Sequence, residues 1–184
     1  SPTLNSNYFL LRTMATNIGT GPQDIPLNQF LGEMAFMDNL ISQGSFTPTL
    51  QDAPDQGGNS ATVATAIGWY VKIGPMVQYT IRLTNIDKSG MTANNQLYIG
   101  NLPFPIKSTI NAIIHVGACD LSNFNPPANA YNAAAFVNAS GSDQNDIRLF
   151  VSIYNAGHDG LEVQHMNTGT NTEIFINISV PVAS

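Results

Sequence analysis

VQYTIRLT, residues 77–84, alternates apolar and polar side chains without a break. Successive side chains of a β-strand point to opposite faces, so this pattern predicts a half-buried antiparallel strand. The pattern places four residues on its core face: Val77, Tyr79, Ile81 and Leu83.

A second strand is predicted directly before it, at residues 69–73 (WYVKI). Here the alternation predicts that Trp69, Val71 and Ile73 face the core, with Tyr70 and Lys72 toward solvent. Only Gly74-Pro75 separates the two strands, which favours a tight hairpin.

Strands are expected along the rest of the chain to Val182, at residues 96–100, 109–118, 133–138, 147–154, 161–166 and 172–181. Turn-forming clusters lie between them at residues 87–90, 123–127, 140–143 and 156–160. About eight to nine short strands with no long helical period predict an all-β fold, an antiparallel β-sandwich of the jelly-roll kind.

The first 44 residues differ from this pattern. Asn28 is placed to cap a short helix whose apolar positions recur at steps of three and four residues. These positions are Phe30, Met34, Met37 and Ile41. A stripe of this kind needs a packing partner, so we predict a stem or docking segment at residues 1–44 and a β-sandwich head at residues 45–184.

Composition excludes several classes of protein. The 184 residues include 6 Lys+Arg and 12 Asp+Glu, a net charge of −6. Basic residues spread singly along the chain give no footprint for nucleic acid. The apolar runs fall short of the roughly 20 residues of a membrane-spanning helix, and we expect no membrane insertion and no secretion signal. A lone Cys119 excludes an internal disulfide.

Four short motifs in order resemble a known family, the tail fibres and related receptor-binding fibres of bacteriophages. They are FLGEMAFMD at 30–38, GSFTPTL at 44–50, GWYVKIG at 68–74, and LYI at 97–99 leading to LPFP at 102–105. Trp69 stands where family members usually carry a tyrosine or an arginine. The resemblance covers approximately residues 19–105, and no motif of this family is found from Lys107 onward.

This resemblance implies a jelly-roll-like head assembled as a homotrimer on a fibre or on the virion surface. Composition is compatible with a trimer, because faces rich in Asn and Thr can be buried between subunits and an apolar N-terminal stripe gains a partner on assembly. Whether the chain is a whole small virion protein or the tip of a longer fibre stays open.

The candidate chemistry is sparse. His115 and Cys119 would share a strand face about 13 Å apart, too far to act as a nucleophile and base. Asp120 follows them, and a structural Cys119 is the better interpretation. The turn at Gly157–Gly160 with His158 lacks a full set of zinc ligands. Residues 140–146 carry oxygen ligands for calcium but lack the glycine and glutamate of an EF-hand loop. We therefore predict no catalytic residue, no cofactor and no metal.

Binding is the chemistry that remains, because recognition is commonly placed on loops of a rigid scaffold. The two longest polar loops are 120–131 and 138–146, and aromatic rings with amides suit a carbohydrate. The alternative is that Phe124 packs into the sandwich and the prolines only stiffen the loop. The candidate residues are Asn123, Phe124, Asn125, Asn129, Tyr131, Asp143 and Asn145.

Three functional hypotheses follow. The first is a non-enzymatic fibre head that binds a host-surface receptor, with a glycan favoured, on the surface of a virion. The second is a structural virion component, such as a decoration, neck or fibre-docking protein, that contacts other virion proteins. The third is a hydrolase of surface polysaccharide, which would need two carboxylates about 5 to 10 Å apart.

Overall fold

Ten antiparallel strands make up the described part of the chain, which in this computed structural model comprises residues 40–54, 57–106, 114–138, 146–154 and 157–182. A short 3₁₀ turn, η2, covers Val163–His165. The strands are β1 Ile41–Phe46, β2 Thr49–Gln51, β3 Thr62–Ile73, β4 Met76–Asp87, β5 Tyr98–Gly100, β6 Ile114–Ser122, β7 Ala130–Asn138, β8 Ile147–Ile153, β9 Gly157–Gly160 and β10 Thr172–Pro181.

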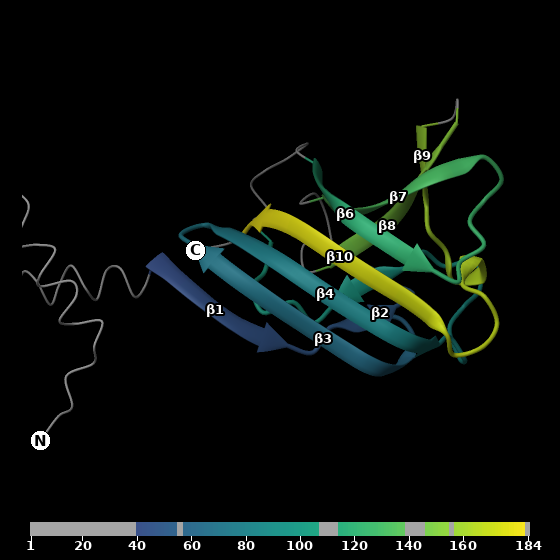
Figure 1. Ribbon diagram of the computed structural model, residues 1–184, viewed down its shortest axis with the longest axis horizontal. Helices are drawn as coiled ribbons and strands as arrows, with labels where there is room; N and C mark the ends of the chain where they lie inside the picture. Colours follow the sequence, from purple (N-terminus) through teal and green to yellow (C-terminus); the bar gives the residue numbers. More distant parts are fainter. Residues whose placement is uncertain (1–39, 55–56, 107–113, 139–145, 155–156, 183–184) are drawn as a thin grey trace, which may run out of the picture. The chain divides into compact units, whose positions relative to one another are not determined.

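A single curled sheet holds all of these strands. Its order is β1-β3-β4-β10-β6-β7-β8-β5-β2, and β9 pairs with β8. β1 and β2 lie at opposite ends of this order, yet only Thr47 and Pro48 separate them along the chain, so the sheet has to curl back on itself. Figure 1 shows β1, β3, β4 and β10 side by side as one layer, with β6 next to β10.

The hydrophobic core fills the space inside the curl. Fully buried side chains from β4 and β10, such as Ile81 and Ile176, belong to the same cluster as Leu50 of β2, Ile99 of β5 and Leu149 of β8. Two parts of the sheet thus bury their apolar faces against each other. The prediction of an all-β, antiparallel, sandwich-like fold is confirmed.

β4 follows its predicted alternation, with Val77, Tyr79, Ile81 and Leu83 buried. The alternation then shifts at a bulge: Glu173 pairs with Thr84 and Thr172 with Ile86, which leaves Asn85 between them at a φ of 54°. The extra residue returns Ile86 to the core. Thr84, expected toward solvent, is buried.

The hairpin at Gly74-Pro75 is confirmed, since Ile73 pairs with Met76 across it. The predicted faces of β3 are wrong. Trp69 and Ile73 are exposed, whereas Tyr70 packs against the core and pairs with the buried Tyr79. Directly paired residues share a face, so the register with β4 decides the matter.

The boundaries of the later elements are confirmed in part. The strand predicted at 172–181 is β10. The strand predicted at 161–166 is wrong, because that segment forms η2, where the Glu162 N–H donates to His165 Nδ1 at 2.9 Å. The turn predicted around His158 is instead β9, paired with β8.

The described residues begin at the end of the predicted stem. Ile41, expected on a helix, starts strand β1 and pairs with Ile73. The predicted boundary at Gly44 therefore falls inside a strand. Phe30, Met34 and Met37 lie outside the described residues, so the stem and its docking role stay predictions. No helix among the described residues is both long and apolar enough to cross a membrane.

Candidate functional site

The pairing between β6 and β7 stops halfway along both strands. The two strands pair from Ile114↔Asn138 to Ala118↔Ala134. Beyond that point, Cys119–Ser122 of β6 pair with β10 alone, while Ala130 and Asn132 of β7 pair with β8 alone. The strands diverge, and residues 123–129 connect their far ends. We call residues 119–133 the opened region.

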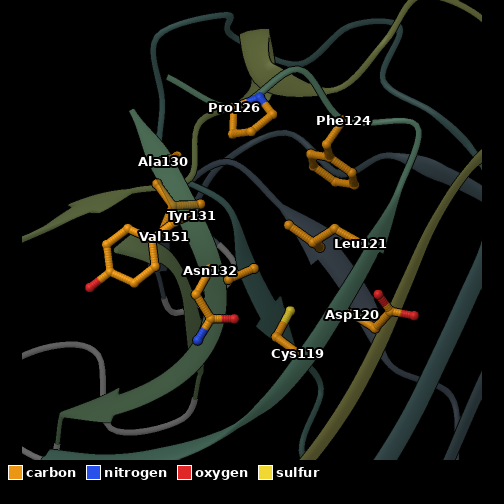
Figure 2. Close-up of a pocket in the computed structure, with 10 residues that line it drawn as sticks. Cys119, Asp120, Leu121, Phe124, Pro126, Ala130, Tyr131, Asn132 and Val151 are labelled. Atoms are coloured by element: carbon orange, nitrogen blue, oxygen red, sulfur yellow. The ribbon is translucent and has the colours of Figure 1, made fainter. Parts of the chain in front are cut away.

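A hollow of about 380 Å³ lies in this region (Figure 2). One wall comes from β6, another from the connecting loop, and a third from β7 with Val151 of β8. The lining residues are Cys119, Asp120, Leu121, Phe124, Pro126, Ala130, Tyr131, Asn132, Ala133 and Val151. Sites for small ligands are typically concave and combine apolar surface with a few polar groups. In this hollow polar and apolar surface contribute about equally.

Hydrogen bonds fix the loop that closes the hollow. Asn125 N–H donates to the His165 carbonyl at 2.6 Å, and Asn167 N–H donates to the Asn123 carbonyl at 3.0 Å. The Asn123 side chain donates from Nδ2 to the carbonyl of Asn171 at 2.7 Å. The loop thus rests on η2 and on the segment before β10.

Two asparagines allow the chain to turn at the ends of this loop. Asn123 has a φ of 61° and Asn129 a φ of 68°, in the left-handed region that asparagine tolerates better than most residues. Both were predicted as binding residues. In the structure Asn123 anchors the loop, and Asn129 accepts a hydrogen bond from Tyr154 N–H at 3.0 Å.

Tyr131 is the most prominent side chain of the opened region. The β7–β8 register shifts between Ala130 and Asn132, so Tyr131 has no direct partner on β8. A bulge of this kind re-aims the side chain that it frees. Tyr131 is 71% exposed, and Tyr154, next to Asn129, is exposed to the same extent. Two tyrosine rings are therefore available to a ligand at this end of the fold.

Phe124 behaves as the alternative interpretation expected. It is half-buried, packs against the core and forms an isolated bridge with Met166, while its ring also lines the hollow. Phe124 therefore contacts the core and also forms part of the wall of the hollow.

Cys119 faces the hollow but is not a nucleophile. Burial, reinforced by the negative charge of Asp120, raises the pKa of this thiol to about 12. The protonated form prevails at neutral pH, and only a thiolate is reactive. Among the ten lining residues Asp120 is the single carboxylate, so this lining offers hydrogen bonds and ring contacts.

Asp146 and His158 are not among the residues that line the hollow. Asp143 and Asn145 fall outside the described residues. Asp146, at the end of the predicted calcium loop, is buried and accepts a hydrogen bond from Gln51 Nε2 at 3.0 Å. His158 contacts Phe150 edge to face. The described segments contain no group of three or more His, Cys, Asp or Glu side chains arranged for a metal.

The loop predicted at residues 120–131 is a connecting segment only at 123–129, because its two ends belong to β6 and β7. Ala133 and Val151, which line the hollow, and Tyr154, whose N–H donates to the Asn129 carbonyl, were not predicted as site residues from the sequence. These residues reach the opened region through the pairing of β7 with β8, so no local signal marks them.

Comparison with known proteins bears on the fold alone. No family model matches the chain, and no curated protein matches it in sequence. Among solved structures it is similar to the crystal structure of the Dettilon tailspike protein (gp208), with 17% identity and a TM-score of 0.57. The match covers 78% of this chain and 24% of the tailspike chain, so this chain spans about a quarter of that protein.

Proposed function

We propose that this protein is a bacteriophage virion protein of the fibre or spike kind that binds a carbohydrate of the host surface through its opened region. The observation that carries the proposal is the hollow between β6 and β7, lined by Phe124, Tyr131 and Asn132, where the pairing of the two strands ends. Aromatic rings and an amide form contacts suited to a hydroxylated ligand.

Two further observations support the virion assignment. The fold resembles part of a tailspike protein, and the four sequence motifs resemble phage fibres. Together they favour a homotrimer on the surface of the virion, in which this chain acts by binding. Asp120 is the only carboxylate among the lining residues, and a glycoside hydrolase needs two.

An array of bacterial surface polysaccharides tests the proposal directly. The full chain should bind at least one printed polysaccharide, and Tyr131→Ala should lower that binding about tenfold or more, since a lost aromatic contact with its hydrogen bond is worth about 1 to 2 kcal/mol. Gln43→Ala, which removes an exposed polar side chain on β1, serves as the control. Binding that both variants retain would contradict the opened region as the site.

Release of reducing ends from a bound polysaccharide would contradict the non-enzymatic part of this proposal. If release occurs, Asp120→Asn tests whether the carboxylate of Asp120, at the edge of the hollow on β6, takes part.

A specific observation favours the second candidate, a structural virion component. Large apolar side chains are exposed on the outer face of β1, β3 and β4: Ile41, Ile67, Trp69, Ile73 and Met76. Exposed apolar patches commonly contact other proteins.

Light scattering should give the mass of three chains for the full protein. A chain beginning at Leu40 keeps β1 intact and would show whether residues 1–39 are needed for assembly or for incorporation into particles.

A further inference from the structure

A second hollow, of about 440 Å³, lies on the outer face of the sheet where β4, β10 and β6 run side by side. Most of its exposed lining is apolar, and the lining residues include Ile81, Ala118, Phe175 and Ile176. Polar groups come from Thr80, Arg82, Asp120 and Asn177. Cys119 and Asp120 line this hollow and also the hollow of the opened region. The two hollows therefore adjoin at β6.

The sheet register arranges these residues in two neighbouring rows. Arg82 pairs with Phe175, and Phe175 pairs with Asp120. One step along, Thr80 pairs with Asn177, and Asn177 pairs with Ala118. Neighbouring strands lie about 4.8 Å apart, so the first row spans about 10 Å. Long antiparallel ladders hold both rows, which makes the surface rigid.

The chemistry of the first row is well defined. The Arg82 guanidinium lies 5.6 Å from the centre of the Phe175 ring, a cation–π contact that holds the donor in place. Asp120, on the other side of Phe175, is exposed and presents a carboxylate acceptor. Donor, ring and acceptor thus follow one another across three strands.

The second row adds polar groups whose orientation is fixed. Gln78 Nε2 donates to Asn177 Oδ1 at 3.0 Å, which orients the Asn177 amide. Thr80 is exposed beside it and offers a hydroxyl. The hollow thus combines a largely apolar surface, which suits the apolar face of a sugar ring, with a guanidinium, a carboxylate, an amide and a hydroxyl that can bond to the sugar's hydroxyl groups.

We infer that the outer hollow is a second subsite for the same carbohydrate, so that the protein binds an oligosaccharide laid across β6 and not a single sugar. One unit would occupy the hollow of the opened region, Asp120 would contact the ligand at the crossing, and later units would lie against Arg82 and Phe175. This inference rests on the proposed function, and it adds the length of the ligand and the surface that it covers.

Chain-length dependence of binding tests the inference. The probe is an array that carries bacterial polysaccharides together with their fragments of one to six sugars. The variants are Arg82→Gln and Phe175→Leu, which remove the guanidinium and the ring while keeping side-chain volume. Gln43→Ala, exposed on β1 of the same face, is the matched control. Thermal unfolding of each variant checks that the fold is intact.

The expected result is that the full chain binds the longer fragments more tightly than single sugars. Arg82→Gln and Phe175→Leu should lower affinity for the longer fragments about tenfold, the order expected for a lost hydrogen bond to a charged group, and leave binding of single sugars unchanged. Gln43→Ala should change neither.

Three outcomes would overturn the inference. If Tyr131→Ala abolishes binding while Arg82→Gln and Phe175→Leu bind every fragment as the parent does, the second subsite fails and the proposed function stands. If the chain binds nothing on the array, both fail. If the two substitutions lower the mass of the assembly in light scattering, another copy of the chain covers this face and the surface is an interface.

Discussion

Two regions of the sheet differ in how completely their strands pair. In the three-strand region, made of β3, β4 and β10, strands of ten to twelve residues pair along almost their whole length and bury one continuous apolar face. In the opened region, β6 and β7 separate after Ala118 and Ala134, and side chains line a hollow. Complete pairing produces a continuous buried face, and its interruption leaves a hollow, which is the binding site that we propose.

Because of this contrast, we expect substitutions in the three-strand region to lower the stability of the fold and substitutions in the opened region to change binding. Side chains on the inner face of the three-strand region are surrounded by other apolar groups, so removing them leaves a cavity. Tyr131 of the opened region projects into solvent, so its removal changes what the surface can bind. Five predictions test the contrast, beginning with the largest effect.

The largest loss of stability should come from Ile81→Ala in β4. Ile81 is 1% exposed within the core cluster, and Ile→Ala in a core costs about 2 to 5 kcal/mol through lost burial and the cavity left behind. Chemical denaturation measures the free energy of unfolding. Thr80→Ala, one residue earlier and exposed, should change it by less than about 0.5 kcal/mol. Similar losses for both would refute the assigned faces.

A smaller loss is expected from Gly117→Ala, at the junction of the two regions. A Cβ added at Gly117 would lie 2.5 Å from the Cβ of Ile178 and 2.6 Å from the carbonyl oxygen of Asn177. β6 would have to move away from β10, at a cost of about 1 to 3 kcal/mol. Thermal unfolding provides the measurement, with Ala118→Ser, at an exposed neighbouring position, as the control. An unchanged melting temperature would mean that β6 can shift without penalty.

Acid should weaken the hydrogen bonds that the Asp52 carboxylate accepts from two loops beside the three-strand region. Asp52 accepts hydrogen bonds from Asn59 N–H at 2.7 Å and Thr92 N–H at 2.6 Å. Burial alone would raise the pKa of Asp52, but the hydrogen bonds from Thr92 and Asn59 outweigh it and hold this pKa below its usual value of 3.8. The stabilisation is therefore present above pH 3.8 and is lost as the pH falls through the lowered pKa.

Asp52→Asn measures that stabilisation. At pH 7 it should reduce the free energy of unfolding by about 1 to 3 kcal/mol, the cost of weakened buried hydrogen bonds. The difference from the parent should shrink at pH 2 to 3. Asp87→Asn, whose carboxylate bonds only to Ser89 two residues away, is the comparison. A difference that stays constant with pH would contradict the ionised state of Asp52.

Mild acid should loosen the loop of the opened region before it affects the three-strand region. Burial lowers the pKa of His165, with Lys88 acting in the same direction and Glu162 and Asp159 against it. The neutral ring accepts a hydrogen bond from the Glu162 N–H, and the His165 carbonyl accepts one from the Asn125 N–H in the loop at residues 123–129. Because the folded protein favours the neutral ring, this stabilisation is complete above pH 6.5 and declines as the pH falls through the lowered pKa.

Hydrogen exchange between pH 7 and pH 5 detects this effect. After correction for intrinsic rates, the Asn125 and Asn167 amides should lose protection while the amides of β4 keep theirs. Equal loss in both regions would mean that the opened region does not loosen separately.

The smallest effect on stability should come from Tyr131→Ala. With 71% of the side chain exposed and no direct partner on β8, its loss should change the free energy of unfolding by less than about 0.5 kcal/mol. The same substitution is predicted to reduce polysaccharide binding strongly. A large destabilisation would instead make Tyr131 a structural residue.

Local alternation in the sequence was sufficient to predict β4 and β10. Their buried faces consist of large apolar residues and their outer faces are mostly polar, so periodicity alone identifies the core side. In β3 both faces carry apolar residues, and the inner face includes Gly68. A Cβ at Gly68 would lie 2.4 Å from the Phe46 ring. The ring of Phe46, from β1, therefore occupies the place that a side chain at position 68 would take. The larger side chains on the opposite face made the wrong side look buried.

The sequence by itself determined the fold class, the Gly74-Pro75 hairpin and the turn at residues 123–127, because strand periodicity and turn chemistry are local properties. Only the tertiary structure decided which face of β3 is buried, where β6 leaves β7, and that Tyr154 and Val151 approach residues 119–133. These features depend on the register between strands that are distant in the chain. Register is fixed when the whole sheet curls around one core, and no short stretch of sequence contains it.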